Sequence, residues 1–299
     1  MRSWLLRRLG TVQCVSLPLT RAVSSCAVEL TFEKYEVEAV KESPPLVILH
    51  GLFGHKRNWH SVSKALSKRL KTTVFAVDLR NHGDSPWTET MTYDDMAADV
   101  ARFLKEIIPR ELGEAGIKVH LLGHSMGGKT AMKIALSPES AGMLESLIVE
   151  DIAPKKYDDF DHHQFIDYLK AMKKANLAQT RHQISQELAA VIPNSSVREF
   201  LITNLAGGNK AWKWKPNLGT IERYLLDVFD QDDSEGCFPC KTLFISGGNS
   251  IYVSEKDHGR ILKLFPKAQF CVIPGSGHWV HAEKPYDFMD QVAKFITDA

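Results

Sequence analysis

The stretch Lys118-Val-His-Leu-Leu-Gly-His-Ser-Met-Gly-Gly-Lys-Thr-Ala-Met-Lys-Ile-Ala-Leu136 decides the fold. Its first residues have the apolar composition of a buried strand, and the residues after Gly127 have that of a helix. Between them, Gly123-His-Ser-Met-Gly127 fits the pattern G-x-S-x-G. Small residues at positions 123 and 127 let strand and helix approach closely, so the strained turn between them is predicted to expose the Ser125 hydroxyl.

Short apolar runs recur along the chain, and each is closed by polar or glycine residues. They predict strands within 28–37, 45–49, 73–77, 118–122, 147–149, 242–245 and 269–273. Continuous apolar strands of this kind are typical of a parallel sheet that is covered on both faces. Helical patterns fill the intervals, including one capped by Thr92 and a last one from Pro285. The sequence therefore predicts an α/β fold with a mostly parallel central sheet.

One interval departs from this alternation. About 90 residues between Asp151 and the strand at 242 contain helical patterns near 160–175, 180–191, 196–206 and 217–229, without a clear strand. The segment Trp212-Lys-Trp-Lys215 is expected to be a cap strand or a packing edge. A helical insertion at the strand ends is typical of a cap over a site. We therefore divide the chain into a core of residues 28–154 and 236–299 and a helical cap of residues 155–235.

Several apolar side chains of this cap are expected either to face the site or to pack the cap onto the core. They are Phe165, Leu169, Leu201, Leu205, Leu225 and Phe229.

Charge and hydropathy exclude two classes of protein. The chain has 37 basic and 36 acidic residues, and without residues 1–28 the balance is 33 to 36, or −3. A near-neutral body without a basic face argues against nucleic-acid binding. No stretch approaches the roughly 18 consecutive apolar residues of a spanning helix, so no transmembrane segment is expected.

Residues 1–27 are expected to be a mitochondrial presequence that directs the protein to the matrix. They combine arginine, serine and threonine with apolar residues and contain no acid, which is typical of mitochondrial import signals. A secretory signal is one alternative, but Arg7 and Arg8 interrupt its apolar core. An unprocessed cytosolic tail is the other. Cleavage is expected between Arg21 and Ala27.

The cysteines indicate a reducing compartment. Cleavage would remove Cys14 and Cys26 and leave Cys237, Cys240 and Cys271. Three cysteines in a body of this size suggest no disulfide framework.

A second glycine-rich turn is predicted to complete an oxyanion site beside Ser125. His50-Gly-Leu-Phe-Gly54 follows an earlier strand. The backbone N–H groups of Leu52 and Met126 are predicted to bind the negative oxygen of a tetrahedral intermediate. His50 itself is expected to organise its loop by hydrogen bonds.

The general base is expected after the last strand. Gly275-Ser-Gly-His-Trp-Val-His281 offers two histidines. Glycines at 275 and 277 let the loop turn and bring His278 to the carboxyl end of the strand, which favours His278 as the base. His281 falls at the start of the next helix and is expected to cap or pack.

These motifs together resemble the α/β-hydrolase superfamily over residues 30–299. The motifs are His50-Gly51, Asp78-Leu-Arg-Asn-His-Gly-Asp-Ser85, Gly123-His-Ser-Met-Gly127 and Gly277-His278. In the loop after Asp78, Arg80 and His82 are expected to be structural and to brace the loop.

The residues within and around these motifs are similar to those of a narrower group. That group contains bacterial short-chain esterases and the mitochondrial α/β-hydrolase domain-containing protein eleven. The similarity lies in His50-Gly-Leu-Phe-Gly54, Asp151-Ile-Ala-Pro154, Gly247-Gly-Asn-Ser250 and Gly277-His-Trp-Val-His-Ala-Glu-Lys-Pro285. The resemblance implies hydrolysis of esters or acylglycerols, a matrix location, and association with the 2-oxoglutarate dehydrogenase complex.

The acid of the catalytic triad is predicted to be Asp151. Most α/β-hydrolases carry this carboxylate in a Gly-x-x-Asp turn after the strand that here ends at Ile245, but this chain has Ser250 in that place. A neutral hydroxyl orients an imidazole but stabilises its cation far less, so Ser250 is expected to be auxiliary. By the family's topology, Asp151 ends the strand beside the strand of Ser125.

One alternative to Asp151 as the acid stays open at this point. Asp151 could instead only cap the loop into the insertion, and Asp257 and Asp230 are then the fallback acids. Glu150 should point to the face opposite Asp151, because side chains alternate along a strand.

The motifs predict a serine hydrolase that cleaves carboxylic esters, either acylglycerols or short-chain acyl esters, through an acyl-enzyme intermediate. The mechanism requires neither a metal nor an organic cofactor. A thioesterase with the same triad is one alternative, and a hydrolase-fold protein that protects a mitochondrial enzyme complex is another.

Overall fold

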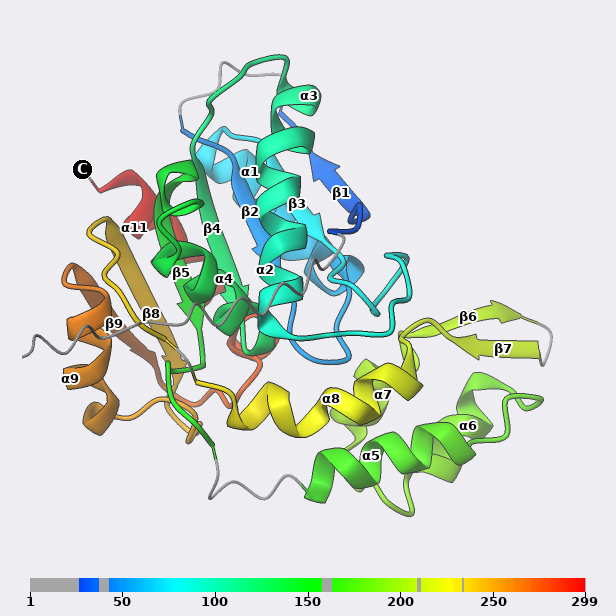
Figure 1. Ribbon diagram of the computed structural model, residues 1–299. Helices are drawn as coiled ribbons and strands as arrows, with labels where there is room; N and C mark the ends of the chain where they lie inside the picture. The colour runs from blue at the N-terminus through cyan, green and yellow to red at the C-terminus, as the bar shows by residue number, and fades with distance from the viewer. Residues whose placement is uncertain (1–26, 38–42, 158–162, 209–210, 233, 299) are drawn as a thin grey trace, which may run out of the picture.

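The computed structural model describes residues 27–37, 43–157, 163–208, 211–232 and 234–298 (Figure 1). The predicted presequence, with Cys14 and Cys26, therefore lies outside the described residues except for Ala27. The three cysteines within the described ranges are free thiols. No helix of these ranges combines the length and apolar character needed to cross a membrane.

A seven-stranded sheet forms the centre of the fold, with the strand order β1-β3-β2-β4-β5-β8-β9. Its strands are β1 (Phe32–Tyr35), β2 (Leu46–Leu49), β3 (Val74–Val77), β4 (Val119–His124), β5 (Leu144–Glu150), β8 (Lys241–Gly247) and β9 (Ala268–Ile273). The pair β1–β3 is antiparallel, and every other neighbouring pair is parallel. The predicted mostly parallel α/β sheet is confirmed.

Helices cover both faces of this sheet. They are α1 (His60–Leu70), α2 (Tyr93–Arg102), α3 (Ile108–Leu112), α4 (Met126–Leu136), α9 (Glu255–Leu264), α10 (Val280–Glu283) and α11 (Pro285–Thr297), with a π-helical turn at Phe103–Ile107 and 3-10 turns at Lys56–Trp59 and Ala141–Met143. Two predicted helix starts are confirmed: the Thr92 side chain accepts a hydrogen bond from the N–H of Asp95, and α11 begins at Pro285.

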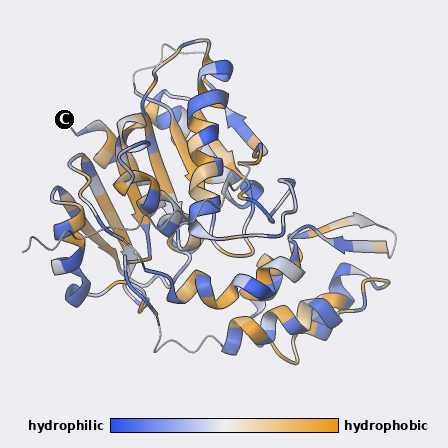
Figure 2. Ribbon diagram, in the orientation of Figure 1, coloured by the Kyte–Doolittle hydropathy of each residue, from blue (hydrophilic) through white to orange (hydrophobic). Residues whose placement is uncertain are grey.

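Side-chain alternation along the strands explains the two layers. Leu46 and Ile48 of β2 pack with α1 and α11, whereas Val47 and Leu49 pack with α2 and α4 on the other face. Figure 2 shows the resulting concentration of hydrophobic residues along the central strands. Because both faces are buried, the strands lack the apolar–polar alternation of a half-exposed sheet.

The long insertion lies beyond the carboxyl ends of β4 and β5 (Figure 1). It comprises α5 (His163–Lys174), α6 (Arg181–Leu188), α7 (Ser195–Ile202), the antiparallel strands β6 (Leu205–Gly208) and β7 (Ala211–Trp214), and α8 (Leu218–Asp230). The four predicted helical stretches are present. The third stretch is shorter than predicted: α7 ends at Ile202, before residue 206, and a β-hairpin follows it.

The residue pattern of β7 explains why this segment forms a strand and not a helix. Trp212 and Trp214 alternate with lysines, which is the period of a strand with one buried face. The indole N–H of Trp214 donates to the carbonyl of Met172 at 2.8 Å, so β7 packs against α5. The expectation of a cap strand at Trp212–Lys215 is therefore confirmed.

Hydrogen bonds fix the insertion to the core in its middle and near its carboxyl end. The Asn204 side chain donates to the carbonyl of Phe53 at 2.7 Å, just before the hairpin. Lys129 of α4 donates to the carbonyl of Phe229 at 2.9 Å, at the end of α8. A cation at a helix carboxyl end is favourable because the last carbonyls have no partner within the helix.

Candidate active site

Ser125 occupies the turn between β4 and α4 in a backbone conformation that is rare for a residue with a side chain. Its φ is 51° and its ψ is −117°. A Cβ atom on Gly123 would lie 2.2 Å from the Gly127 carbonyl oxygen, and one on Gly127 would lie 2.5 Å from that of His50. Only glycine fits at these two positions. Ser125 is partly exposed between buried neighbours.

Asp151 lies directly after β5, which pairs with β4 as the topology predicts. Its φ is 50° and its side chain is fully buried. The carboxylate accepts hydrogen bonds from the Gly247 N–H at 3.1 Å, the Ser250 hydroxyl at 2.5 Å and His278 Nδ1 at 2.7 Å. The serine that stands in the usual aspartate turn therefore hydrogen-bonds to the carboxylate. Of the fallback acids, Asp257 binds Lys155 instead and caps the start of α9.

His278 lies on the loop after β9, with its side chain 13% exposed. Because its Nδ1 donates to a carboxylate, the other ring nitrogen, Nε2, is the one left to accept a proton. The ring stacks on Tyr252 at 3.9 Å between centroids and 24° between planes. Within the described residues Ser125 Oγ makes no hydrogen bond to His278, and such contacts often tighten only when substrate binds.

The Leu52 and Met126 amides flank this turn, and neither N–H has an acceptor among the described residues. Two buried imidazoles hold the backbone around Leu52. His50 Nε2 accepts from the Leu79 N–H at 3.0 Å, and His82 Nε2 accepts from the Phe53 N–H at 3.2 Å. The expected loop-bracing roles of His50 and His82 are confirmed.

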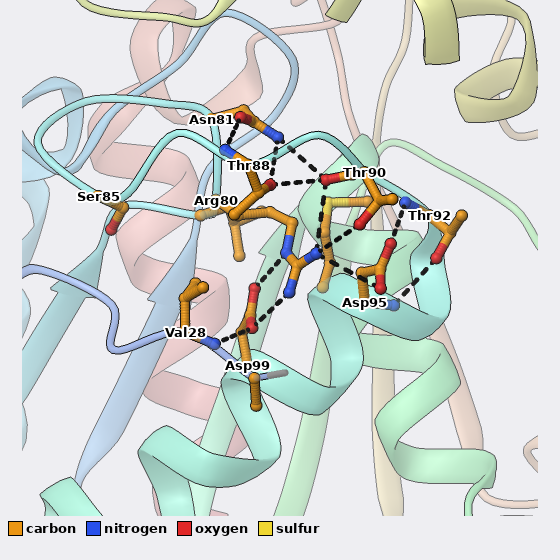
Figure 3. A network of polar contacts seen from close by, with 12 residues as sticks. Val28, Arg80, Asn81, Ser85, Thr88, Thr90, Thr92, Asp95 and Asp99 are labelled. Carbon is orange, nitrogen blue, oxygen red and sulfur yellow. Dashed lines mark hydrogen bonds and ion pairs between the residues drawn. The ribbon is translucent and has the colours of Figure 1, made fainter. Parts of the chain in front are cut away.

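Arg80 fixes the loop that carries His82 (Figure 3). Its guanidinium donates twice to Asp99 of α2, at 2.6 and 2.8 Å, and lies 3.4 Å from Asp95. Asp99 also accepts a hydrogen bond from the N–H of Val28 at 2.7 Å. This bond holds the segment before β1 against α2. The predicted structural role of Arg80 is confirmed.

A cavity of about 300 Å³ opens beside His278 between the core and the insertion. Its walls include Leu52, Phe165, Val197, Phe200, Leu201 and Tyr252. Phe165 and Leu201 thus face the site, as two of the expected cap residues. Leu169, Leu205, Leu225 and Phe229 are buried within the hydrophobic core instead.

Comparison with known proteins identifies the family. A family model described as the alpha/beta hydrolase fold matches residues 44–285. The chain belongs to the α/β-hydrolase fold family.

Relatives of this hydrolase are named as lipases and esterases. It is 36% identical over 278 residues to the sn-1-specific diacylglycerol lipase ABHD11 of Xenopus laevis, covering 91% of this chain and 85% of the relative. It is 33% identical to Esterase YbfF of Escherichia coli, covering 85% and 93% of the two chains. A solved structure described as a marine microorganism esterase has a TM-score of 0.79 at 33% identity, covering 90% and 99%. The hydrolase is therefore carboxylesterase- or lipase-like.

A second polar cluster lies behind the site of this hydrolase, and the sequence did not reveal it as a unit. His124, Glu150 and His281 are all buried, with potential ligand atoms within 4.8 Å of one another. His281 Nδ1 donates to Glu150 at 2.8 Å, and His124 Nε2 donates to the His278 carbonyl at 2.9 Å. These contacts occupy one ring nitrogen of each histidine and the Glu150 carboxylate, so the three residues form a hydrogen-bonded cluster. Glu150 bonds His281, whereas Asp151 bonds His278.

Buried histidines should make this hydrolase acid-sensitive. Burial lowers the pKa of His50, His124 and His281 to about 3, and that of His82 and His120 to about 4. In the unfolded chain these imidazoles take up protons near their ordinary pKa of 6.5. Their stabilisation is therefore complete above pH 6.5 and is lost as the pH falls from there toward 4.

We accordingly expect a lower free energy of unfolding in urea at pH 5 than at pH 7. Glu150 has the opposite effect on stability and offsets part of this loss. Burial raises its pKa to about 7, so its protonation favours the folded protein below that pH. Equal or greater stability at pH 5 would contradict the expectation.

Proposed function

We propose that this hydrolase cleaves carboxylic esters by two-step acyl transfer at Ser125. His278 Nε2 takes the hydroxyl proton while Ser125 Oγ attacks the ester carbonyl, and the oxyanion binds the amides of Leu52 and Met126. The alcohol leaves with the proton from His278. Water, deprotonated by His278, then attacks the acyl-enzyme, which releases the acid and restores the serine. The steps need neither a metal nor an organic cofactor.

The hydrogen bond from His278 Nδ1 to the buried Asp151 carboxylate carries this proposal. It sets the tautomer in which Nε2 is a base, and the negative carboxylate stabilises the imidazolium that forms. Asp151 is itself oriented by the Gly247 N–H and the Ser250 hydroxyl. Ser250 therefore acts as an auxiliary that positions the acid.

The amides of Leu52 and Met126 have no acceptor in the part of the chain that the structure describes, which supports an oxyanion site. Backbone N–H groups in a protein interior nearly always have a partner, so two unpaired amides beside a nucleophile favour a ligand oxygen. Fixed donors of this type are each worth about 3–4 kcal/mol of transition-state stabilisation. The strained φ of 59° at Phe53 indicates that the loop is held in this shape by its surroundings.

The cavity favours an acyl group of modest size as the recognised part of the substrate. About 300 Å³ is at the lower end for small-molecule sites, and the side chains of Phe165, Phe200 and Leu201 make an apolar wall. A short-chain ester, or one acyl chain of an acylglycerol, fits that chemistry. The names of the relatives, a diacylglycerol lipase and esterases, agree with it.

A substrate panel tests the proposal. Purified protein should hydrolyse aryl esters of increasing acyl length and diacylglycerol, with acyl thioesters measured beside them. Higher kcat/KM on thioesters would favour the thioesterase alternative. No hydrolysis of any ester or thioester would refute the proposal and favour a protective role for the folded chain.

The cap should select the acyl length. Phe165→Ala and Leu201→Ala enlarge the cavity, so we expect the kcat/KM ratio of octanoyl to acetyl esters to rise about tenfold. Leu226→Ala is the control, because Leu226 lies in the same insertion and is 52% exposed. Variants that change stability while leaving this ratio constant would show that the cap is only structural.

We further infer that residues 1 to about 25 direct mitochondrial import. A fusion of this segment to a fluorescent protein should co-localise with the matrix, and replacing Arg2, Arg7, Arg8 and Arg21 by glutamine should abolish it. A diffuse cytosolic signal, or secretion, from the unaltered fusion would refute import. Association with the 2-oxoglutarate dehydrogenase complex rests on family resemblance alone and requires this location.

A further inference from the structure

Each member of the proposed triad has a near neighbour in sequence that belongs to the second buried cluster. His124 precedes Ser125 and Glu150 precedes Asp151, while His281 follows the base by three residues. His124 and Glu150 are paired residues of β4 and β5. The strand ends thus carry the triad residues and, one position earlier, the cluster residues.

His124 contacts the main chain of the base. Its Nε2 lies 2.9 Å from the His278 carbonyl oxygen. Since a carbonyl only accepts, His124 Nε2 must carry the hydrogen. Burial lowers the pKa of His124 to about 3, so near neutral pH the ring is uncharged with its single hydrogen in this bond. The two rings lie 4.8 Å apart between centroids.

Glu150 and His281 anchor the chain immediately after the base. Glu150 Oε1 accepts from both the N–H and the Nδ1–H of His281, at 2.9 and 2.8 Å. The imidazole of His281 also stacks on Trp59 at 3.9 Å and 15°. The first turn of α10 is therefore fixed from inside the protein.

Glu283 binds the same loop by hydrogen bonds from the solvent side. Its carboxylate accepts from the N–H of Gly277 at 2.7 Å and from that of Trp279 at 3.3 Å. The two amides on either side of His278 and its own carbonyl are thus all hydrogen-bonded. Of these three contacts, only the bond from His124 comes from the residue beside the nucleophile.

We propose that His124 is a positioning residue for His278, because its bond to the main-chain carbonyl couples the base directly to the nucleophile turn, with Glu150 and His281 as support. None of the three touches the reacting atoms. The inference rests on the proposed serine mechanism. A shift of the base by about 1 Å can lower turnover about a hundredfold, so a bond that fixes this distance affects rate rather than affinity.

Matched histidine variants test the role. His124→Phe keeps a buried ring but removes the donor, whereas His124→Gln restores an N–H donor. His120→Phe is the control: His120 lies on the same face of β4, is buried and bonds Ser146 at 2.7 Å, but sits at the opposite end of the strand. kcat should be expressed per active site counted by complete fluorophosphonate labelling, so that unfolded protein is excluded.

We expect His124→Phe to lower kcat per labelled site about tenfold to a hundredfold, with KM within about twofold. His124→Gln should recover part of the loss, and His120→Phe should match the wild type even if it is less stable. Unchanged kcat per site in His124→Phe, or an equal loss in His120→Phe, would overturn the proposal.

Two variants of Glu150 provide a second test if His124→Phe does not fold. Glu150→Gln keeps an acceptor oxygen for His281, whereas Glu150→Leu removes both. We expect kcat per site near the wild-type value in the first and about tenfold lower in the second. Equal values in the pair would overturn the supporting role. An unlabelled, inactive wild-type protein would instead refute the serine mechanism itself, and this inference with it.

Discussion

Ser125→Ala should lower the turnover of every ester substrate about a millionfold while leaving the fold intact. The nucleophile and base act as a unit, so His278→Ala should lose about as much. The measurements are kcat at saturating ester and unfolding in urea for each purified variant. Because Ser125 Oγ has no hydrogen bond within the described residues, we expect its removal to change the free energy of unfolding by less than about 1 kcal/mol.

A serine on the same helix provides the control. Ser137 lies at the carboxyl end of α4, where it terminates the helix. Ser137→Ala should keep wild-type turnover. Ester hydrolysis at the wild-type rate by purified Ser125→Ala would end the serine-hydrolase account.

Asp151→Asn should lower turnover about ten-thousandfold, and Ser250→Ala by less than about tenfold. The asparagine keeps the shape but cannot stabilise the imidazolium, and its amide group disturbs the tautomer of His278. Ser250→Ala removes one of three donors to the carboxylate and leaves those of Gly247 and His278. Both variants should be measured at saturating ester, beside unfolding in urea.

The ranking of these two variants decides which residue is the acid. A larger loss in Ser250→Ala than in Asp151→Asn would place the acid's role in the turn from Gly247 to Ser250. It would also reduce Asp151 to a residue that holds this turn in place.

Local sequence was sufficient wherever the structure depends on neighbours in the chain. The strand, turn and helix around Ser125 follow from composition and from glycines that leave no room for a Cβ. The adjacency of β4 and β5 came from the family's topology, since it depends on contacts between distant segments. Of the hairpin after α7, β6 was missed, because four residues give too short a pattern to oppose a helical one.

The contacts around His278 were beyond local sequence for a related reason. Tyr252 stacks on the ring although it belongs to no motif, and Glu283 binds the flanking amides although its motif gave it no role. The cluster of His124, Glu150 and His281 needs the register of β4 on β5 and the return of the chain at α10. Similarly, periodicity marked Phe165 and Leu169 alike as apolar, but only the packed insertion shows that Phe165 lines the cavity.

Mass spectrometry of the protein after reaction with a fluorophosphonate tests the central claim most directly. The probe needs an activated serine and the oxyanion site but no knowledge of the natural substrate. We predict a single phosphonyl adduct on the peptide that contains Ser125, absent from Ser125→Ala and strongly slowed in His278→Ala. An adduct on another residue, or no adduct on protein that hydrolyses esters, would contradict the account.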